Sequence, residues 1–253
     1  MPGPAGAGLR LAVTTLTVLP LRPGRVDRAA GRSAMAVVPL VGVGLGALAA
    51  ALAVGLTHLG APPLLTAAVV LGGLAGASRG LHLDGLADTA DGLGSHGEPA
   101  RALAVMRSPE IGALGAVTLL LCLLVQAAAL AALVADHRWL GVAAGVAVGR
   151  LAISWACRRG VPPARPDGLG ALVADSLPVT VPAAWTVVLA AASVPVVDGR
   201  PWQGPVAVLI AVGVGVGLVW HVTRRIGGVT GDVLGATCEI TAAVTWAVLA
   251  LTA

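Results

Sequence analysis

The chain has 253 residues, of which 57% are apolar and only 11% carry a charge, and its mean hydropathy is +0.91. Soluble domains typically contain about 25% charged residues, so this composition excludes an ordinary soluble domain and predicts an all-α, polytopic integral membrane bundle. All sixteen basic residues are arginine, and they outnumber twelve acidic residues. Arginine at the ends of membrane spans meets anionic lipid, so we favour the lipid bilayer over nucleic acid as the partner of this positive charge.

The first apolar segment, residues 8–21, is too short to cross about 30 Å of hydrocarbon. It ends beside a proline and is followed by arginines at positions 22, 25, 28 and 32. We therefore predict an interfacial helix in an N-terminal segment, residues 1–33.

Seven longer apolar segments follow, each close to the 17–25 residues that a spanning helix needs. Small residues recur in them and allow close helix packing in lipid. We therefore predict a single transmembrane catalytic domain, residues 1–253, with about seven spans. The second segment is the least apolar, because glycines and Arg79 interrupt its end. The approximate bounds are 34–58, 62–81, 111–135, 139–157, 179–197, 205–223 and 233–252.

Arginine is distributed unevenly between the loops. If the N-terminus is cytoplasmic, thirteen arginines lie on the cytoplasmic side and two, Arg138 and Arg200, on the other. Because arginine in short loops marks the cytoplasmic side, we predict an N-in membrane protein. Three polar loops, approximately 79–115, 158–178 and 224–236, then share the cytoplasmic face.

The first polar loop contains three aspartates, Asp84, Asp88 and Asp91, within eight positions. In a helix with about 100° per residue, this spacing places the carboxylates within an arc of roughly 60°, with His82 on the opposite side. Like charges on one helical face repel unless a cation lies between them, and the alternative is a solvated face. Since Mg²⁺ is commonly held by one or two carboxylates and substrate phosphates, residues 82–110 are our candidate cytoplasmic catalytic loop.

Arginine and glycine accompany the carboxylates in all three polar loops. Guanidinium groups bind phosphate oxygens, and glycine lets a backbone approach a phosphate closely. These residue types favour pyrophosphate chemistry. The candidate substrate-binding residues are Arg79, Arg107, Arg150, Arg165, Arg224, Gly228 and Thr230.

Some of these residues also have a structural interpretation. Asp232 is either a metal ligand or the N-cap of the last helix. His82 is either a ligand or acid–base group, or a structural hydrogen-bonding residue. Arg150 lies within a span, where a charge is costly and is usually functional or paired. Three cysteines in apolar stretches, Cys122, Cys157 and Cys238, are expected to be small buried hydrophobes.

The sequence HLDGLADTADGL (82–93) resembles the signature of the cobalamin synthase family, the adenosylcobinamide-GDP ribazoletransferases. These enzymes perform the last assembly step of the nucleotide loop of vitamin B12. One departure from the family pattern is Ser108-Pro109-Glu110, where another acidic and basic pattern is expected. The resemblance covers nearly the whole chain through TLTVLPL (15–21), MRSPEIGALG (106–115), GR (149–150), ARPDGLG (164–170) and GGVTGDVLGA (227–236).

The resemblance implies a multi-pass enzyme of the bacterial cytoplasmic (inner) membrane, with its active site facing the cytoplasm. Such an enzyme joins α-ribazole, or its 5′-phosphate, to adenosylcobinamide-GDP, releases GMP and uses Mg²⁺. A ribazole hydroxyl would attack the phosphorus attached to cobinamide, and an aspartate or His82 would accept its proton. We expect residues 82–91 and 227–232 to meet at the cytoplasmic mouth of the bundle. The implied catalytic residues are His82, Asp84, Asp88 and Asp232, and the implied metal ligands are Asp84, Asp88, Asp91 and Asp232.

Two alternatives remain from the sequence. A CDP-alcohol-type membrane phosphotransferase also uses spaced aspartates, but its Asp-Gly pair is followed by Ala-Arg, and GLADTAD (85–91) lacks this arginine. A transporter with an acidic ion site would place its carboxylates near mid-membrane, whereas these lie at the end of a span. The sequence also leaves open whether the chain forms a homo-oligomer.

Overall fold

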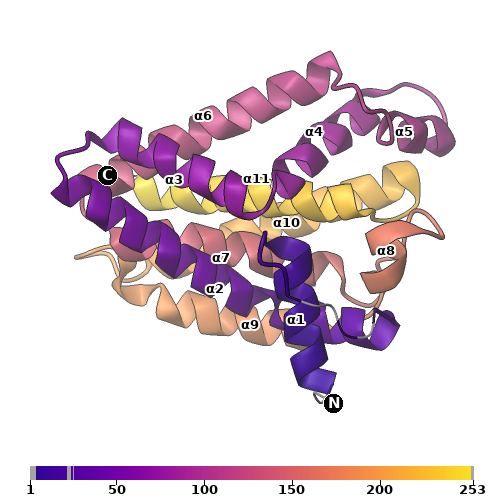
Figure 1. Cartoon of the computed structure of the whole chain (residues 1–253), viewed down its shortest axis with the longest axis horizontal. Helices are drawn as coiled ribbons and strands as arrows, with labels where there is room; N and C mark the ends of the chain where they lie inside the picture. Colours follow the sequence, from indigo (N-terminus) through magenta and orange to yellow (C-terminus); the bar gives the residue numbers. More distant parts are fainter. Residues whose placement is uncertain (1–3, 22–23, 25, 252–253) are drawn as a thin grey trace.

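The structure is a computed structural model that describes residues 4–21, 24 and 26–251. The described residues form helices and no strands, and Figure 1 shows the helices gathered into one bundle. They are α1 (Pro4–Leu16), α2 (Arg28–His58), α3 (Pro63–Ala77), α4 (Leu81–Gly94), α5 (Pro99–Val105), α6 (Ala113–Ala135), α7 (Trp139–Ala156), α8 (Gly168–Val173), α9 (Thr180–Ala192), the 3₁₀ helix η1 (Val194–Val196), α10 (Gln203–Ile226) and α11 (Gly231–Ala250).

Each of the seven predicted apolar segments contains a helix, which confirms the all-α polytopic fold. Within the described residues, five helices are long and apolar enough to cross a membrane: α2, α6, α7, α10 and α11. Helices α3 and α4 would supply a sixth span if they are counted together, although they are bent by 89°. Helix α9 and η1 form a shorter apolar stretch. The number of seven spans therefore stays a prediction.

The break between α3 and α4 shortens the predicted segment at 62–81. Arg79 and Gly80 both have positive φ angles, 56° and 71°, a region that glycine adopts readily and other residues rarely do. Before the break, the Ser78 hydroxyl donates to the Leu74 carbonyl at 3.0 Å. The chain turns at these residues, so α4 leaves the direction of α3.

Helix α2 begins six residues earlier than predicted. The Asp27 side chain accepts a hydrogen bond from the Ala30 amide at 2.9 Å, which is an N-cap and stabilises the first turn of the helix. The segment predicted as residues 1–33 therefore includes the start of a span. Helix α1 buries Leu11 and Leu16 in the same core cluster as residues of α2. Its interfacial position stays a prediction, and the arginines at 22 and 25 lie outside the described residues.

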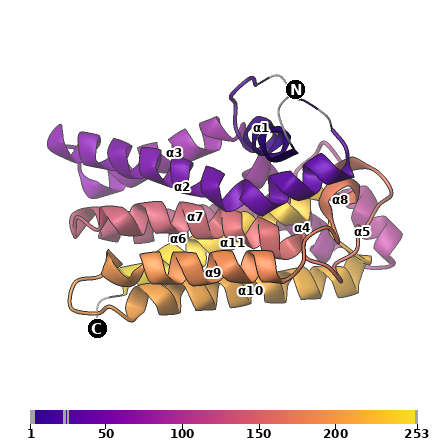
Figure 2. The same cartoon turned by 90° about the horizontal axis from the view of Figure 1, so that it is seen from below.

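The three predicted polar loops lie together at one end of the bundle, which we call the polar end. Figures 1 and 2 place α4, α5, α8 and the start of α11 there. The Ala164 amide donates to the Val229 carbonyl at 3.0 Å, and the Arg225 guanidinium donates to the Ser95 carbonyl at 2.7 Å. The structure thus confirms that the loops share a face, and its cytoplasmic orientation stays a prediction.

Helices α4 and α11 approach each other closely enough for their backbones to touch. A Cβ atom at Gly85 would lie 2.5 Å from the Asp232 carbonyl oxygen, and one at Gly235 would lie 3.0 Å from the His82 Cα. Only glycine fits such approaches without a backbone shift. These two contacts set the position of α4 relative to α11 and therefore determine which side chains meet at the polar end.

Candidate active site

Helix α4 runs without interruption through its glycines, so the predicted arrangement of carboxylates on one face is confirmed. Asp84 is exposed, Asp88 and Asp91 are half-buried, and His82 is buried on the side that faces the bundle. A Cβ atom at Gly92 would lie 2.5 Å from the Met106 side chain. Gly85 and Gly92 therefore serve helix packing.

The carboxylates of α4 are joined by Asp232 from α11, and we call these four residues the acidic cluster (Asp84, Asp88, Asp91 and Asp232). Partial burial, followed by repulsion from Asp84, Asp232 and Asp91, raises the pKa of Asp88 to about 6, and Arg165 opposes this shift. The repulsion shows that the other three carboxylates lie within electrostatic reach of Asp88. The structure thus brings residues 82–91 and 227–232 together, as predicted.

Asp91 has a structural role that the sequence analysis did not consider. Its two carboxylate oxygens accept hydrogen bonds from the Gly112 and Gly115 amides, each at 2.7 Å. These amides belong to the start of α6, where backbone donors otherwise lack partners and negative charge is favourable. Asp91 therefore caps α6. Each oxygen retains a lone pair, and the metal role of Asp91 stays a prediction.

Asp232 is not the N-cap of α11. That position belongs to Thr230, whose hydroxyl oxygen accepts from the Val233 amide at 3.3 Å and donates to Asp232 Oδ2 at 3.0 Å. The Arg165 guanidinium also donates to this oxygen at 3.0 Å. The capping interpretation of Asp232 is therefore wrong, and its carboxylate is held in place by a hydroxyl and a guanidinium from two different loops.

Two open cavities flank the first turn of α4, and Leu81 lines both. The first has a volume of about 350 Å³ and is lined by Arg165, Thr230 and Asp232 and, at its exposed edge, by the ion pair between Arg107 and Asp167. The second has a volume of about 540 Å³ and is lined by Arg79 and Asp84 together with apolar residues. Polar groups from all three loops therefore line two open cavities that share Leu81.

Two predicted substrate-binding residues have other contacts. A Cβ atom at Gly228 would lie 2.4 Å from the Pro162 carbonyl oxygen, so this glycine allows two polar loops to pack together. The Arg224 guanidinium carbon lies 4.8 Å from the centre of the Trp220 ring. Arg224 is exposed, and it is absent from the described residues that line the two cavities.

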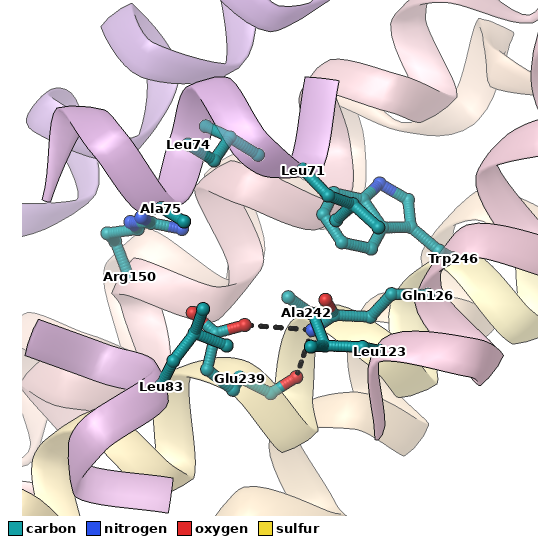
Figure 3. Close-up of a pocket in the computed structure, with 10 residues that line it drawn as sticks. All are labelled: Leu71, Leu74, Ala75, Leu83, Leu123, Gln126, Arg150, Glu239, Ala242 and Trp246. Atoms are coloured by element: carbon teal, nitrogen blue, oxygen red, sulfur yellow. Dashed lines mark hydrogen bonds between the residues drawn. The ribbon is translucent and has the colours of Figure 1, made fainter. Parts of the chain in front are cut away.

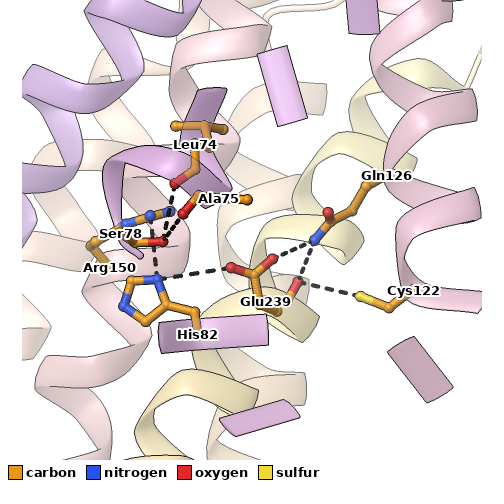
Figure 4. A network of polar contacts seen from close by, with 8 residues as sticks. All are labelled: Leu74, Ala75, Ser78, His82, Cys122, Gln126, Arg150 and Glu239. Carbon is orange, nitrogen blue, oxygen red and sulfur yellow. Dashed lines mark hydrogen bonds and ion pairs between the residues drawn. The ribbon is translucent and has the colours of Figure 1, made fainter. Parts of the chain in front are cut away.

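His82 and Arg150 belong to a second polar group, which lies inside the bundle. We call it the buried network (His82, Gln126, Arg150 and Glu239; Figure 4). Arg150 Nη2 lies 3.4 Å from His82 Nδ1, and Glu239 Oε1 lies 3.9 Å from the same atom. Gln126 Nε2 donates to Glu239 Oε2 at 2.8 Å. Three of these side chains are at most 3% exposed, so His82 and Arg150 are placed for structural contacts within the bundle.

Glu239 and Gln126 were not predicted from the sequence. The sequence does contain a signal for this network. Glu239 is an ionisable residue inside an apolar span and therefore needs a partner, and Arg150, a second such residue, was a candidate for that partner. Figure 3 shows Arg150, Gln126 and Glu239 around a small cavity of about 20 Å³, closed on another side by Trp246. Such a volume suits about one water molecule.

Potential metal ligands also converge in the buried network. Among the described residues, His82, Cys238 and Glu239 are the one group of three whose ligand atoms all lie within 4.8 Å of one another. The Arg150 guanidinium beside His82 already supplies positive charge there, which opposes a second cation. The acidic cluster is more open, so a metal there would depend on phosphate oxygens to complete its coordination. All three cysteines are free and buried, as predicted.

Comparison with known proteins places the chain in a family. A family model described as cobalamin-5-phosphate synthase matches residues 8–250. An adenosylcobinamide-GDP ribazoletransferase from Frankia casuarinae is 43% identical and aligns with 96% of this chain and 94% of its own length. Proteins with the same name from Nocardioides sp. and Corynebacterium efficiens are 43% and 41% identical, covering 93% and 96% of this chain and 95% and 90% of their own lengths. No solved structure matches significantly.

Proposed function

Because this chain belongs to the cobalamin-5-phosphate synthase family, we propose that it joins α-ribazole, or α-ribazole 5′-phosphate, to adenosylcobinamide-GDP and releases GMP. We locate this reaction where residues 82–91 meet residues 227–232 beside two open cavities. The family match extends along the chain, which favours this activity over a CDP-alcohol-type phosphotransferase or a transporter.

In this reaction, a ribazole hydroxyl oxygen forms a bond to the phosphorus attached to cobinamide. The bond from that phosphorus to the GMP phosphate oxygen breaks, and the hydroxyl proton is transferred to a base. Negative charge grows on the leaving GMP, and preorganised cations stabilise such charge. Arg165 and Arg107 line the first cavity and Arg79 lines the second, so we assign these guanidinium groups to the phosphates.

The acidic cluster fits a divalent cation because its donors are carboxylate oxygens whose mutual repulsion raises the pKa of Asp88. We assign Mg²⁺ to Asp84 and Asp88, with Asp232 close by and Asp91 as a further carboxylate. Bound Mg²⁺ would supply positive charge that stabilises the diphosphate as its bond breaks. An aspartate is better placed than His82 to accept the hydroxyl proton, because the His82 side chain is 2% exposed and lies in the buried network.

The activity can be tested with protein purified in detergent. Incubation with adenosylcobinamide-GDP and α-ribazole should release GMP and form adenosylcobalamin in equal amounts. A chelator should stop the reaction, and added Mg²⁺ should restore it. Absence of GMP release in protein that melts cooperatively would contradict the activity. Full turnover in the chelator would contradict the Mg²⁺ assignment alone.

We further propose that the polar end faces the cytoplasm from the bacterial inner membrane. Thirteen of the sixteen arginines lie on this side in the predicted topology, as the positive-inside rule requires. Single cysteines can test the orientation because the native cysteines are buried. In intact cells, an impermeant thiol reagent should label Leu59→Cys, whose parent residue is 85% exposed, and should label His96→Cys only after the cells are opened. The reverse pattern would contradict the orientation.

A further inference from the structure

A third cavity at the polar end is rich in arginine and lies outside the acidic cluster. Its volume is about 600 Å³, and its lining includes Arg28, Arg32, Arg159, Asp175 and Ser176. Arg28 and Arg32 come from the start of α2, and Arg159 follows the end of α7. The proposed reaction assigns no role to these side chains.

The positive charge of this cavity is poorly compensated within the protein. Among the described residues, the guanidinium groups of Arg32 and Arg159 have no hydrogen-bonding or ion-pair partner. Arg28 and Arg32 are four residues apart on one helix face, where like charges repel. The N-terminus of α2 already has the carboxylate of its N-cap, Asp27, so the charge that lacks a partner is that of Arg32 and Arg159. An anion between these guanidinium groups would offset their charge.

The walls of the cavity are held in place before any ligand binds. The Arg28 guanidinium donates to the Ala171 and Ala174 carbonyls at 3.1 and 2.8 Å, which ties α2 to the end of α8. The Arg159 amide donates to the Leu177 carbonyl at 2.7 Å, and the Gly160 amide donates to Asp175 Oδ1 at 2.7 Å. A preorganised arrangement of this kind loses less entropy when it binds a ligand.

The position of the arginines along the helices identifies the kind of anion. Arg32 precedes the apolar part of the spanning helix α2, and Arg159 lies three residues after the end of the spanning helix α7. Residues at the ends of spans lie at the depth of the lipid headgroups. Basic pockets between the ends of membrane helices recognise anionic headgroups. We propose that this cavity binds the phosphate of an anionic phospholipid headgroup through Arg32 and Arg159, with Arg28 adding positive charge.

Lipid binding can be measured on delipidated protein in a neutral detergent by native mass spectrometry. Phosphatidylglycerol should bind at least fivefold more tightly than zwitterionic phosphatidylcholine. The double variant R32Q/R159Q should reduce this preference to about that of phosphatidylcholine. R101Q, which removes a charge from exposed Arg101 on α5, is the matched control and should retain the preference. Equal binding of both lipids to the wild type, or an unchanged preference in R32Q/R159Q, would overturn the proposal.

A second variant tests the same cavity in the opposite direction. Asp175→Asn keeps the oxygen that accepts from Gly160 but removes the negative charge, so it should strengthen phosphatidylglycerol binding about twofold or more. Weaker binding in this variant would overturn the proposal. A last arm adds 10 mM inorganic phosphate: full displacement of the lipid by phosphate would assign the cavity to a soluble phosphate and overturn the lipid assignment. GMP release is measured separately, so failure of the proposed activity would not affect these outcomes.

Discussion

The acidic cluster and the buried network are two polar regions that share one helix, and they are built on opposite principles. The acidic cluster gathers four charges of the same sign at an open surface, with Arg165 as the ion-pair partner of Asp232. The buried network combines Arg150 and Glu239, which carry opposite charges, with the neutral partners His82 and Gln126. Because α4 turns about 100° per residue, its first turn sends His82 into the bundle and Asp84 out of it.

This difference indicates that the acidic cluster serves to bind a cation and that the buried network serves to stabilise the fold. In the buried network, residues of the chain supply both signs of charge, and removing one charge beside a buried ion is destabilising. His82 Nε2 and Arg150 Nε have no hydrogen-bond partner among the described residues. The acidic cluster retains repulsion that raises the pKa of Asp88, and an external cation would remove it. Substitutions of Asp84 and Asp88 should therefore change turnover more than stability, and substitutions in the buried network should do the reverse.

The largest expected effect comes from the two least constrained carboxylates of α4. Asp84→Asn and Asp88→Asn should each lower turnover by about 10³-fold, because each removes charge that would hold Mg²⁺ against the diphosphate. The melting temperature should stay close to that of the wild type, since among the described residues neither side chain forms a hydrogen bond or an ion pair. GMP release and thermal melting in detergent measure the two quantities. Wild-type turnover in both variants, with a persistent need for metal, would contradict the assignment.

The buried network should show the opposite pattern. Glu239→Gln removes the negative charge that lies 3.9 Å from His82 Nδ1, the atom that Arg150 approaches to 3.4 Å. Buried Arg150 then loses this neighbouring negative charge, so the free energy of unfolding should fall by about 1–3 kcal/mol. Turnover of the protein that remains folded should fall much less. Denaturation in detergent and GMP release at low temperature separate these effects. The double variant Arg150→Met/Glu239→Gln serves as a control and should recover part of the stability, because it removes both charges. If Glu239→Gln melts like the wild type, the network is not stabilising.

Much of the fold could be predicted from the sequence because membrane helices are specified by local composition. Seven apolar stretches gave seven helical regions, and the spacing of Asp84, Asp88 and Asp91 placed them correctly on one face. The break after α3 was not predicted, because it depends on two successive left-handed residues, Arg79 and Gly80. The spacing of apolar residues does not indicate positive φ angles at these two positions.

The sequence predicted the parts of the candidate site that follow from membrane topology, and it did not predict the contacts between individual distant residues. The pairing of residues 82–91 with 227–232 followed from both segments being on one face of the membrane. The cap that Asp91 provides to α6 depends on the return of the chain at Gly112. The pairing of Glu239 with Gln126 depends on how α11 meets α6. Such tertiary contacts join distant residues, and a single sequence does not identify them.

A smaller effect on turnover is expected at Asp232, which links the acidic cluster to the third loop. Asp232→Asn should lower turnover about 30-fold, because one charge near the metal is lost. Stability should fall by no more than about 1 kcal/mol, because Thr230 provides the N-cap and the lost charge belongs to a partly exposed ion pair with Arg165. Asp167→Asn is a matched control on the exposed edge of the first cavity, where an exposed ion pair contributes little, and its turnover should fall less than about threefold. Equal turnover in the two variants would remove Asp232 from the site.

The smallest expected effect tests whether the close approach of α4 and α11 holds the acidic cluster together. Gly85→Ala places a methyl group where the Asp232 carbonyl lies 2.5 Å away, and a backbone atom cannot rotate aside. We expect a loss of about 1–2 kcal/mol in stability and a higher Mg²⁺ concentration for half-maximal GMP release. Gly94→Ala is the matched control in the same helix. Its methyl group would meet only the tip of the Leu114 side chain, which can move, while alanine favours the helix by up to about 1 kcal/mol. If Gly85→Ala shows the same Mg²⁺ dependence as Gly94→Ala, the contact between the two backbones does not set the geometry of the acidic cluster, and the metal is held by α4 alone.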